Sequence, residues 1–322
     1  MNKILVTDAL DPDLDGTACI VAYSELLKHA GQNVSTLIFG TPQEESSFVL
    51  KKLGIDIPSG DDMTLVFDEI VLVDTSAVRW LSKKIDPKKV SEVIDHREVH
   101  SVEEFPNAKI EIEKVGSCAT LIAEKFMKDQ IIPSEKSAII MFAAIVSNTI
   151  NFKNKVTTDR DRAAAKWLVD LYGIKDDIIH QMFAFKSDLK FSIQEIFQSQ
   201  IGHHYFADKK VSTFQLEIMG VEKFVKEKLE EIKRELLAIA SREGYECTLF
   251  TLVDIEEGNN TFVVADKQSE EVIGKALKVK FENGVAHYPH VIMRKEILPK
   301  LKDYLETDLS TSSLQRRAGE MT

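Results

Sequence analysis

Short β-branched runs alternate with amphipathic stretches through the first half of the chain, and this alternation constrains the fold more than any other feature. Strand-like runs fall at 3–6, 34–39, 69–73 and 90–94, and helix-like stretches at 17–30, 44–53 and 117–128, with a helical turn at 82–84. Parallel strands need crossover connections, which are usually helices. The pattern therefore predicts an α/β domain, a mainly parallel sheet with helices on both faces. Further helices at 134–148 and 159–171 complete this domain over residues 1–186.

The pattern changes between residues 183 and 192. A helix is predicted at 193–199, a strand at 210–216, a long charged helix at 221–242, and strands at 248–254 and 261–265. A basic turn follows, just before Pro299. These elements predict a smaller mixed α/β C-terminal domain over residues 193–308. Residues 309–322 are mostly polar and predict a disordered tail.

The charge balance narrows the possible partners. The chain of 322 residues has a formal net charge of −11, whereas proteins that bind nucleic acid usually carry a basic face. We expect no nucleic acid as main ligand, although a metal ion and local cations can still attract a small anion. The first residues are too polar for a signal peptide, and no apolar run approaches about 18 residues. We therefore expect a cytoplasmic protein with no membrane segment.

Acidic side chains follow three of the predicted strands. Asp8, Asp11, Asp13 and Asp15 follow the first strand, Asp74 follows the run at 71–73, and the triplet DHR at 95–97 follows the run at 93–94. Ligands of an open parallel sheet bind at the carboxyl ends of its strands. A single aspartate after a strand is more often a helix cap or a turn former. Three such loops together predict a cation, because gathered carboxylates repel each other without one.

The donor types indicate which cation is suitable. Carboxylate oxygens with one imidazole suit Mg²⁺ or Mn²⁺, with Mn²⁺ favoured as nitrogen enters the shell. A fourth polar turn, at 147–149, adds Asn148 after a helix-like segment. Two ions a few Å apart could hold a phosphate and generate a hydroxide nucleophile.

Several short motifs point to a known family. They are DPDLDGTA at 11–18, LVD at 72–74, DHR at 95–97, VGSCAT at 115–120, AIVSNT at 144–149, TDRDR at 158–162 and RKEILP at 294–299. In this order they resemble the DHH phosphoesterase superfamily, and within it the manganese-dependent inorganic pyrophosphatases and exopolyphosphatases. The resemblance extends to about residue 305 and implies that the N-terminal domain holds the metal while the C-terminal domain closes over the substrate.

The resemblance also implies roles for individual residues. The metal ligands would be Asp13, Asp15, Asp74 and His96, with Asn148 at the position of a further ligand. The substrate contacts would be Arg97, Ser117, His204, Arg294 and Lys295, and the helix that opens at Ser117 could direct its amide end at phosphate. The cofactor would be one or two Mn²⁺ or Mg²⁺ ions, and a homodimer could form through an edge strand.

The chain departs from the family pattern at several positions. Ala9 replaces a metal-binding histidine, Asn148 an aspartate, Arg97 the second histidine of the DHH motif, and Met293 an arginine. The family's lysine early in the second domain aligns with His203 or His204, or alternatively with Lys190. Losing an imidazole and a carboxylate would weaken a two-ion centre, and we hypothesise that Asp8 or Asp11 is a substitute ligand, which manganese anomalous scattering can test.

Three functions are compatible with these observations. The first is a metal-dependent hydrolase that cleaves a phosphoric anhydride, pyrophosphate or short polyphosphate, in a cleft between the two domains. The second is a phosphate-binding homologue with weak or no catalysis, suggested by Ala9, Arg97 and Asn148. The third is a phosphodiesterase acting on oligonucleotides or cyclic dinucleotides, whose glycine-rich C-terminal motif is missing, since the chain has no Gly-Gly pair.

Overall fold

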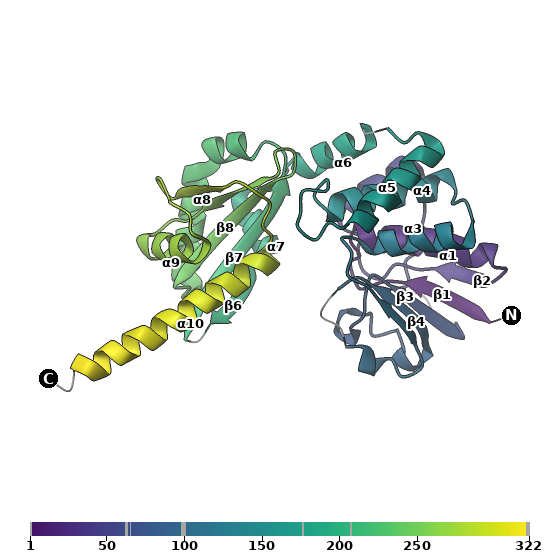
Figure 1. The fold of residues 1–322 in the computed structure, drawn as a ribbon, viewed down its shortest axis with the longest axis horizontal. Helices are drawn as coiled ribbons and strands as arrows, with labels where there is room; N and C mark the ends of the chain where they lie inside the picture. The colour runs from purple at the N-terminus through teal and green to yellow at the C-terminus, as the bar shows by residue number, and fades with distance from the viewer. Residues whose placement is uncertain are drawn as a thin grey trace. The chain divides into compact units, whose positions relative to one another are not determined.

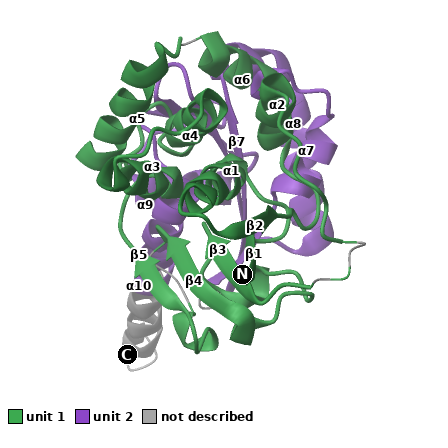
Figure 2. Cartoon of the chain, turned by 90° about the vertical axis from the view of Figure 1, so that its right-hand side faces the viewer, with its two compact units in different colours: residues 1–185 green, residues 186–322 purple. Residues whose placement is uncertain are grey.

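The computed structural model describes residues 2–319 except 62, 63, 65, 98–100, 176 and 207, and it describes no side chain from residue 308 onward. The chain divides into two compact units, residues 1–185 and residues 186–322 (Figure 2). Each unit is described by itself below.

The first unit is built on a five-stranded sheet. Its strands have the order β2-β1-β3-β4-β5, and every neighbouring pair is parallel. The strands are β1 (Lys3–Thr7), β2 (Asn33–Thr36), β3 (Glu69–Val73), β4 (Val90–Asp95) and β5 (Lys109–Ile112). The α-helices are α1 (Leu14–His29), α2 (Glu44–Leu53), α3 (Cys118–Asp129), α4 (Glu135–Asn148), α5 (Asp159–Tyr172) and α6 (Asp177–Ser187). The predicted α/β fold with a mainly parallel sheet is confirmed.

The two faces of this sheet are covered differently. Helices α1 and α3 lie along one face, and α4 and α5 pack beyond them (Figure 1). On the opposite face, alternate strand residues such as Leu5, Leu72 and Val93 pack against Leu81 and Phe105. This second layer contains the short 3-10 turns Val78–Trp80, Pro87–Lys89 and Val102–Glu104 rather than long helices.

The strand order fixes where a ligand site can form. Strand β1 is flanked by β2 on one side and by β3 on the other, so the direction of winding reverses at β1. Ligands of open α/β sheets bind at such a switch point, beyond the carboxyl ends of the strands. The loops that follow β1, β3 and β4 carry Asp8, Asp74 and His96, and they meet at this edge.

The second unit contains a five-stranded mixed sheet of order β10-β9-β8-β7-β6. The β7–β8 pair is parallel, and the other pairs are antiparallel. Its strands are β6 (Gly202–Phe206), β7 (Lys209–Ile218), β8 (Cys247–Asp254), β9 (Asn259–Val263) and β10 (Val285–Tyr288). Its helices are α7 (Ile193–Gln200), α8 (Val221–Glu243), α9 (Lys267–Leu277) and α10 (Arg294–Gly319). Apolar residues of both sheet faces form two buried clusters, centred on Phe250 and Phe262.

Some elements were not expected from the sequence. The strands β5, β6 and β10 and the helices α6 and α9 were not predicted. The prediction of a basic turn before Pro299 was wrong, because Arg294 and Lys295 form the first turn of α10. The backbone of α10 is helical to Gly319, residues 320–322 lie outside the described residues, and a tail separate from the domain stays a prediction. Among the residues with a described structure, no helix is long and apolar enough to cross a bilayer.

Candidate metal centre

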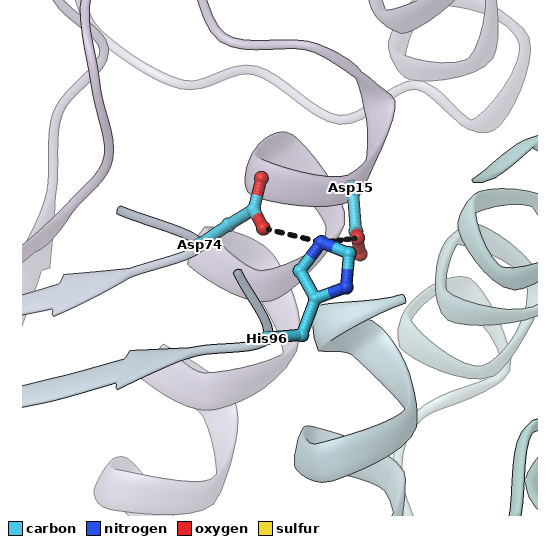
Figure 3. Close-up of side chains that lie close together, drawn as sticks. All are labelled: Asp15, Asp74 and His96. Carbon is cyan, nitrogen blue, oxygen red and sulfur yellow. Dashed lines mark ion pairs between the residues drawn. The ribbon is translucent and has the colours of Figure 1, made fainter. Parts of the chain in front are cut away.

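Three side chains from distant parts of the chain converge at the carboxyl edge of the first sheet. One ligand atom from each of Asp15, Asp74 and His96 lies within 4.8 Å of the others (Figure 3). The His96 Nε2 atom is 3.7 Å from Asp15 Oδ2 and 3.4 Å from Asp74 Oδ1. Asp15 belongs to the first turn of α1, and the other two residues follow β3 and β4.

The ring of His96 is oriented by a backbone carbonyl. His96 Nδ1 lies 3.0 Å from the carbonyl oxygen of Val115, which can only accept, so Nδ1 carries the hydrogen. With the hydrogen on Nδ1, the other ring nitrogen, Nε2, faces the two carboxylates and is the atom that can bind a metal. This is the arrangement by which proteins orient a metal-binding histidine. Three acceptor atoms meet here, and a cation is what such a set can bind.

Asp15 is held in place by the start of α3. Its carboxylate accepts hydrogen bonds from Ser117 Oγ at 2.8 Å and from the backbone N–H groups of Cys118 at 2.8 Å and Ala119 at 2.9 Å. Asp15 therefore accepts from two of the amides that the sequence analysis expected to face a phosphate, and the role of Ser117 as a substrate contact stays a prediction. Ser117 is fully buried behind Asp15 and positions that carboxylate. Burial raises the pKa of Asp15, while His96 and the donors Ala119 and Ser117 oppose the rise.

Asn148 and Asp13 also support Asp15. Asn148, the last residue of α4, donates from Nδ2 to Asp15 Oδ2 at 2.5 Å. Asp13 caps α1 by accepting at Oδ1 from the N–H groups of Asp15 at 3.0 Å and Gly16 at 3.1 Å. Neither residue belongs to the converging triad. Asn148 contacts the carboxylate of Asp15, and Asp13 contacts the backbone N–H of Asp15 at the start of α1. Their predicted roles as metal ligands stay predictions.

Asp74 is the most strained member of the triad. Its backbone has a φ of 55°, in the left-handed region that residues other than glycine seldom adopt. Asp74 Oδ2 accepts from Arg97 Nη2 at 3.0 Å, whereas Asp74 Oδ1 is buried without a hydrogen-bond partner. Burial raises the pKa of Asp74 well above its ordinary value, and the guanidinium of Arg97 opposes the rise. Asp74 Oδ1, a buried carboxylate oxygen with no hydrogen-bond partner beside an imidazole nitrogen, is therefore suited to bind a cation.

Asp8 is a further buried carboxylate at the same edge. Only 2% of its surface is exposed, and its Oδ1 has no hydrogen-bond partner. A Cβ built on Gly16 would lie 1.7 Å from Asp8 Oδ2, so the glycine makes room for this carboxylate at the start of α1. Burial and the nearby charge of Asp13 raise the pKa of Asp8 to about 8. Asp11, in contrast, is exposed and accepts from the N–H of Thr41 at 2.7 Å.

Two buried aspartates that sequence reasoning did not assign shape the loops around the centre. Asp95 accepts from Ser76 Oγ at 2.5 Å and from the N–H of His96 at 2.7 Å, which fixes the loop after β4. Asp161 accepts from the N–H of Gly116 at 2.9 Å and from Thr120 Oγ1 at 2.6 Å. The spacing of Thr158 and Asp161 indicates a helix cap, but nothing in it reveals the contact with Gly116.

In the second unit, two predicted substrate-binding residues lie side by side. A Cβ on Gly202 would lie 2.8 Å from His204 Nε2 and 3.1 Å from Arg294 Nη1, so both side chains border this glycine. Burial and the charge of Arg294 lower the pKa of His204. Arg294 donates from Nη2 to the carbonyl of Gln200 at 2.6 Å, and its buried Nε has no partner.

The other candidates of this unit are placed differently. His203 Nδ1 contacts the hydroxyl of Tyr245, so the His pair points to opposite faces of β6 and only His204 borders Arg294. Lys295 is exposed in the first turn of α10, beside the half-buried Met293. Lys190 lies in the segment between α6 and α7. Of the two histidines, His204 is therefore the one that lies beside Arg294.

Comparisons with known proteins match both units. Residues 3–145 match the DHH family, N-terminal domain, and residues 180–304 match the DHHA2 domain. A Clostridium acetobutylicum protein named "Probable manganese-dependent inorganic pyrophosphatase" is 26% identical over 311 residues, covering 94% of this chain and 98% of that protein. A Bacillus licheniformis protein of the same name is 27% identical over 310 residues, covering 95% and 100%.

Solved structures agree with these matches. A Methanococcus jannaschii protein assigned to the family II inorganic pyrophosphatases has a TM-score of 0.68 and 28% identity, covering 94% of this chain and 99% of that chain. An exopolyphosphatase-related protein from Bacteroides fragilis has a TM-score of 0.51 at 14% identity, covering 95% and 92%, and supports the fold alone.

Proposed function

We propose a function from the premise that this chain belongs to the DHH family, with a DHH N-terminal domain followed by a DHHA2 domain. The resemblance drawn from the sequence motifs is thereby confirmed. We infer that the chain is a metal-dependent hydrolase of phosphoric anhydrides, acting on pyrophosphate or short polyphosphate, with Mn²⁺ or Mg²⁺ as cofactor. A cytoplasmic location and a homodimer remain predictions.

The convergence of Asp15, Asp74 and His96 is the observation that carries this proposal. Their atoms supply two oxygens and one nitrogen, a donor set that fits Mn²⁺. A divalent ion at this site supplies a Lewis acid that activates water near neutral pH and offsets phosphate charge. Besides burial, the nearby groups Asp15, Asp13 and Asp8 raise the pKa of Asp74 while the guanidinium of Arg97 opposes the rise, and a divalent cation would offset this repulsion.

The side chains of this chain would bind and orient the substrate. Water adds to one phosphorus, the bridging P–O bond breaks, and the protons of the water are left on the phosphate products. Arg97, Arg294 and Lys295 are the proposed charged phosphate contacts, because guanidinium and ammonium groups form the strongest charge-assisted bonds to phosphate. His204, whose pKa is lowered by burial and by the charge of Arg294, is proposed as a neutral hydrogen-bonding contact. Arg97 cannot donate a proton near neutral pH, so it acts as a charge and not as a general acid.

The test is phosphate release from pyrophosphate and tripolyphosphate with Mn²⁺, Mg²⁺ or Co²⁺, with nucleotides and phosphodiesters in the same screen. We expect anhydride hydrolysis with Mn²⁺, and Asp74→Asn should lower it at least about 100-fold because the triad loses an anionic ligand. Asp170→Asn, an exposed change in the same unit, is the matched control and should keep full activity. Absence of release from every anhydride would refute hydrolysis.

A second function, phosphate binding without efficient turnover, is supported by one contact. Asn148 donates its amide to Asp15, whereas an aspartate here would add a negative charge to the centre. If this function is correct, the parent protein binds pyrophosphate with little turnover, and Ala9→His combined with Asn148→Asp creates hydrolysis. Rapid turnover by the parent protein excludes it.

A further inference from the structure

The two oxygens of Asp74 have different partners. Oδ1 is buried without a hydrogen bond and lies 3.4 Å from His96 Nε2, within the triad. Oδ2 accepts from Arg97 Nη2 at 3.0 Å. One oxygen is thus left for a metal ion, and the other already has a cation beside it.

The guanidinium of Arg97 lies among the acidic groups that the triad leaves out. The carboxylates of Asp95, Asp8 and Asp13 act on it electrostatically, in addition to Asp74. Asp8 Oδ1 is buried and has no hydrogen-bond partner. The side chain of Arg97 is 40% exposed, so the group borders both the acidic cluster and the solvent.

A second divalent ion would compete with this guanidinium. Such an ion would need Asp74 Oδ2 or the neighbouring carboxylates, and the positive charge of Arg97 would repel it at close range. Arginine remains protonated in proteins, so this repulsion persists at every accessible pH. Ala9 supplies no imidazole, and Asn148 directs its amide nitrogen at Asp15, so neither residue compensates.

We propose that the chain binds a single divalent ion at Asp15, Asp74 and His96, and that the Arg97 guanidinium is a permanent second cation beside Asp74 Oδ2. The proposal rests on the metal centre of the proposed function and not on the hydrolysis itself. Arg97 uses one N–H for Asp74, and a guanidinium has five N–H donors, so others are available for phosphate. Chelation would then remove only part of the positive charge that faces the substrate.

The experiment measures how many ions bind. The metal-free full-length protein is dialysed against Mn²⁺, the bound metal is counted by mass spectrometry, and low-temperature electron paramagnetic resonance detects coupling between neighbouring Mn²⁺ ions. The wild type should bind one ion per chain with no Mn–Mn coupling. Arg97→Gln should bind a second ion with a coupled spectrum, because Asp74 Oδ2, Asp8 and Asp13 lose their cation.

Two further variants separate charge from general disruption. Arg97→Lys keeps a positive charge and should remain at one ion. Arg160→Gln is the matched control, because Arg160 is also 40% exposed and pairs with Glu113 and Glu124, neither of which belongs to the triad. It should also bind one ion, and thermal melting verifies that each variant is folded.

Three results would count against the proposal. A coupled pair in the wild type overturns it, even if no Arg97 variant folds. One ion in both the wild type and folded Arg97→Gln would show that the guanidinium does not exclude the second ion. If no ion binds to the wild type, the triad is not a metal centre. One bound ion without pyrophosphate hydrolysis leaves this inference standing and removes the proposed activity, so the two failures are distinguishable.

Discussion

At the scale of single residues, the centre contains carboxylates that are costly to bury. Asp8 is the clearest case, because its pKa is raised to about 8 from an ordinary value of 3.8. A raised carboxylate pKa means that the folded state binds more protons than the unfolded state between these values. The contribution of Asp8 to the free energy of unfolding is therefore complete below pH 3.8, where the carboxyl is protonated in both states, and it is lost as the pH rises to about 8.

Asp8→Asn should therefore stabilise the metal-free protein, and the gain should grow with pH. Near pH 4 the variant and the parent should be similar, whereas above pH 8 the variant should gain on the order of a few kcal/mol. Urea unfolding of the EDTA-treated protein tests this. The fluorescence of Trp80 and Trp167, which both lie in the first unit, monitors the unfolding. A gain that is the same at all pH values would contradict the assigned cause.

At the scale of elements, one aspartate connects the start of α5 to the loop that opens α3. Asp161 completes the cap with Thr158 and also accepts from Gly116, next to the Ser117 and Ala119 donors of Asp15. Removing Asp161 would leave buried donors unpaired and would release the loop that holds Asp15, a candidate metal ligand.

We expect Asp161→Ala to destabilise the first unit by about 2–4 kcal/mol and to weaken Mn²⁺ binding about tenfold or more, although Asp161 is not in the triad. Asp159→Ala is the control, because Asp159 lies in the same first helical turn but is exposed. Denaturant unfolding and Mn²⁺ titration measure the two effects. Unchanged Mn²⁺ affinity in folded Asp161→Ala would show that the loop keeps its position without this residue.

Some of these elements and contacts could be predicted from the sequence and others could not. The parallel sheet was predictable because β1, β3 and β4 are apolar runs that end in polar loops. Strand β6 was not, since its residues alternate in exposure without an apolar pattern. Asp15, Asp74 and His96 were identified by motif. The inward role of Ser117 and the contact between Asp161 and Gly116 depend on how distant segments meet, which spacing along the chain does not encode.

At the scale of the whole molecule, all triad residues belong to the first unit. A ligand stabilises the part of a protein that binds it, so Mn²⁺ should slow hydrogen exchange selectively. We expect increased protection at the ends of β1, β3 and β4 and at the starts of α1 and α3, with little change in β7 and β8. Mass spectrometry of exchanged peptides measures this, and Asp74→Asn should abolish the effect. Equal protection in both units would contradict it.

The confinement of the triad to one unit also bears on how such proteins diversify. The candidate metal ligands come from the first sheet and its helices, whereas His204 and Arg294 belong to a unit with its own cores. If His204 and Arg294 contact the substrate as proposed, substitutions in the second unit would change which phosphate compound is accepted without altering the residues of the triad. On that proposal, selection would act on substrate choice and on reactivity as separate traits, and a lineage would be able to lose one before the other.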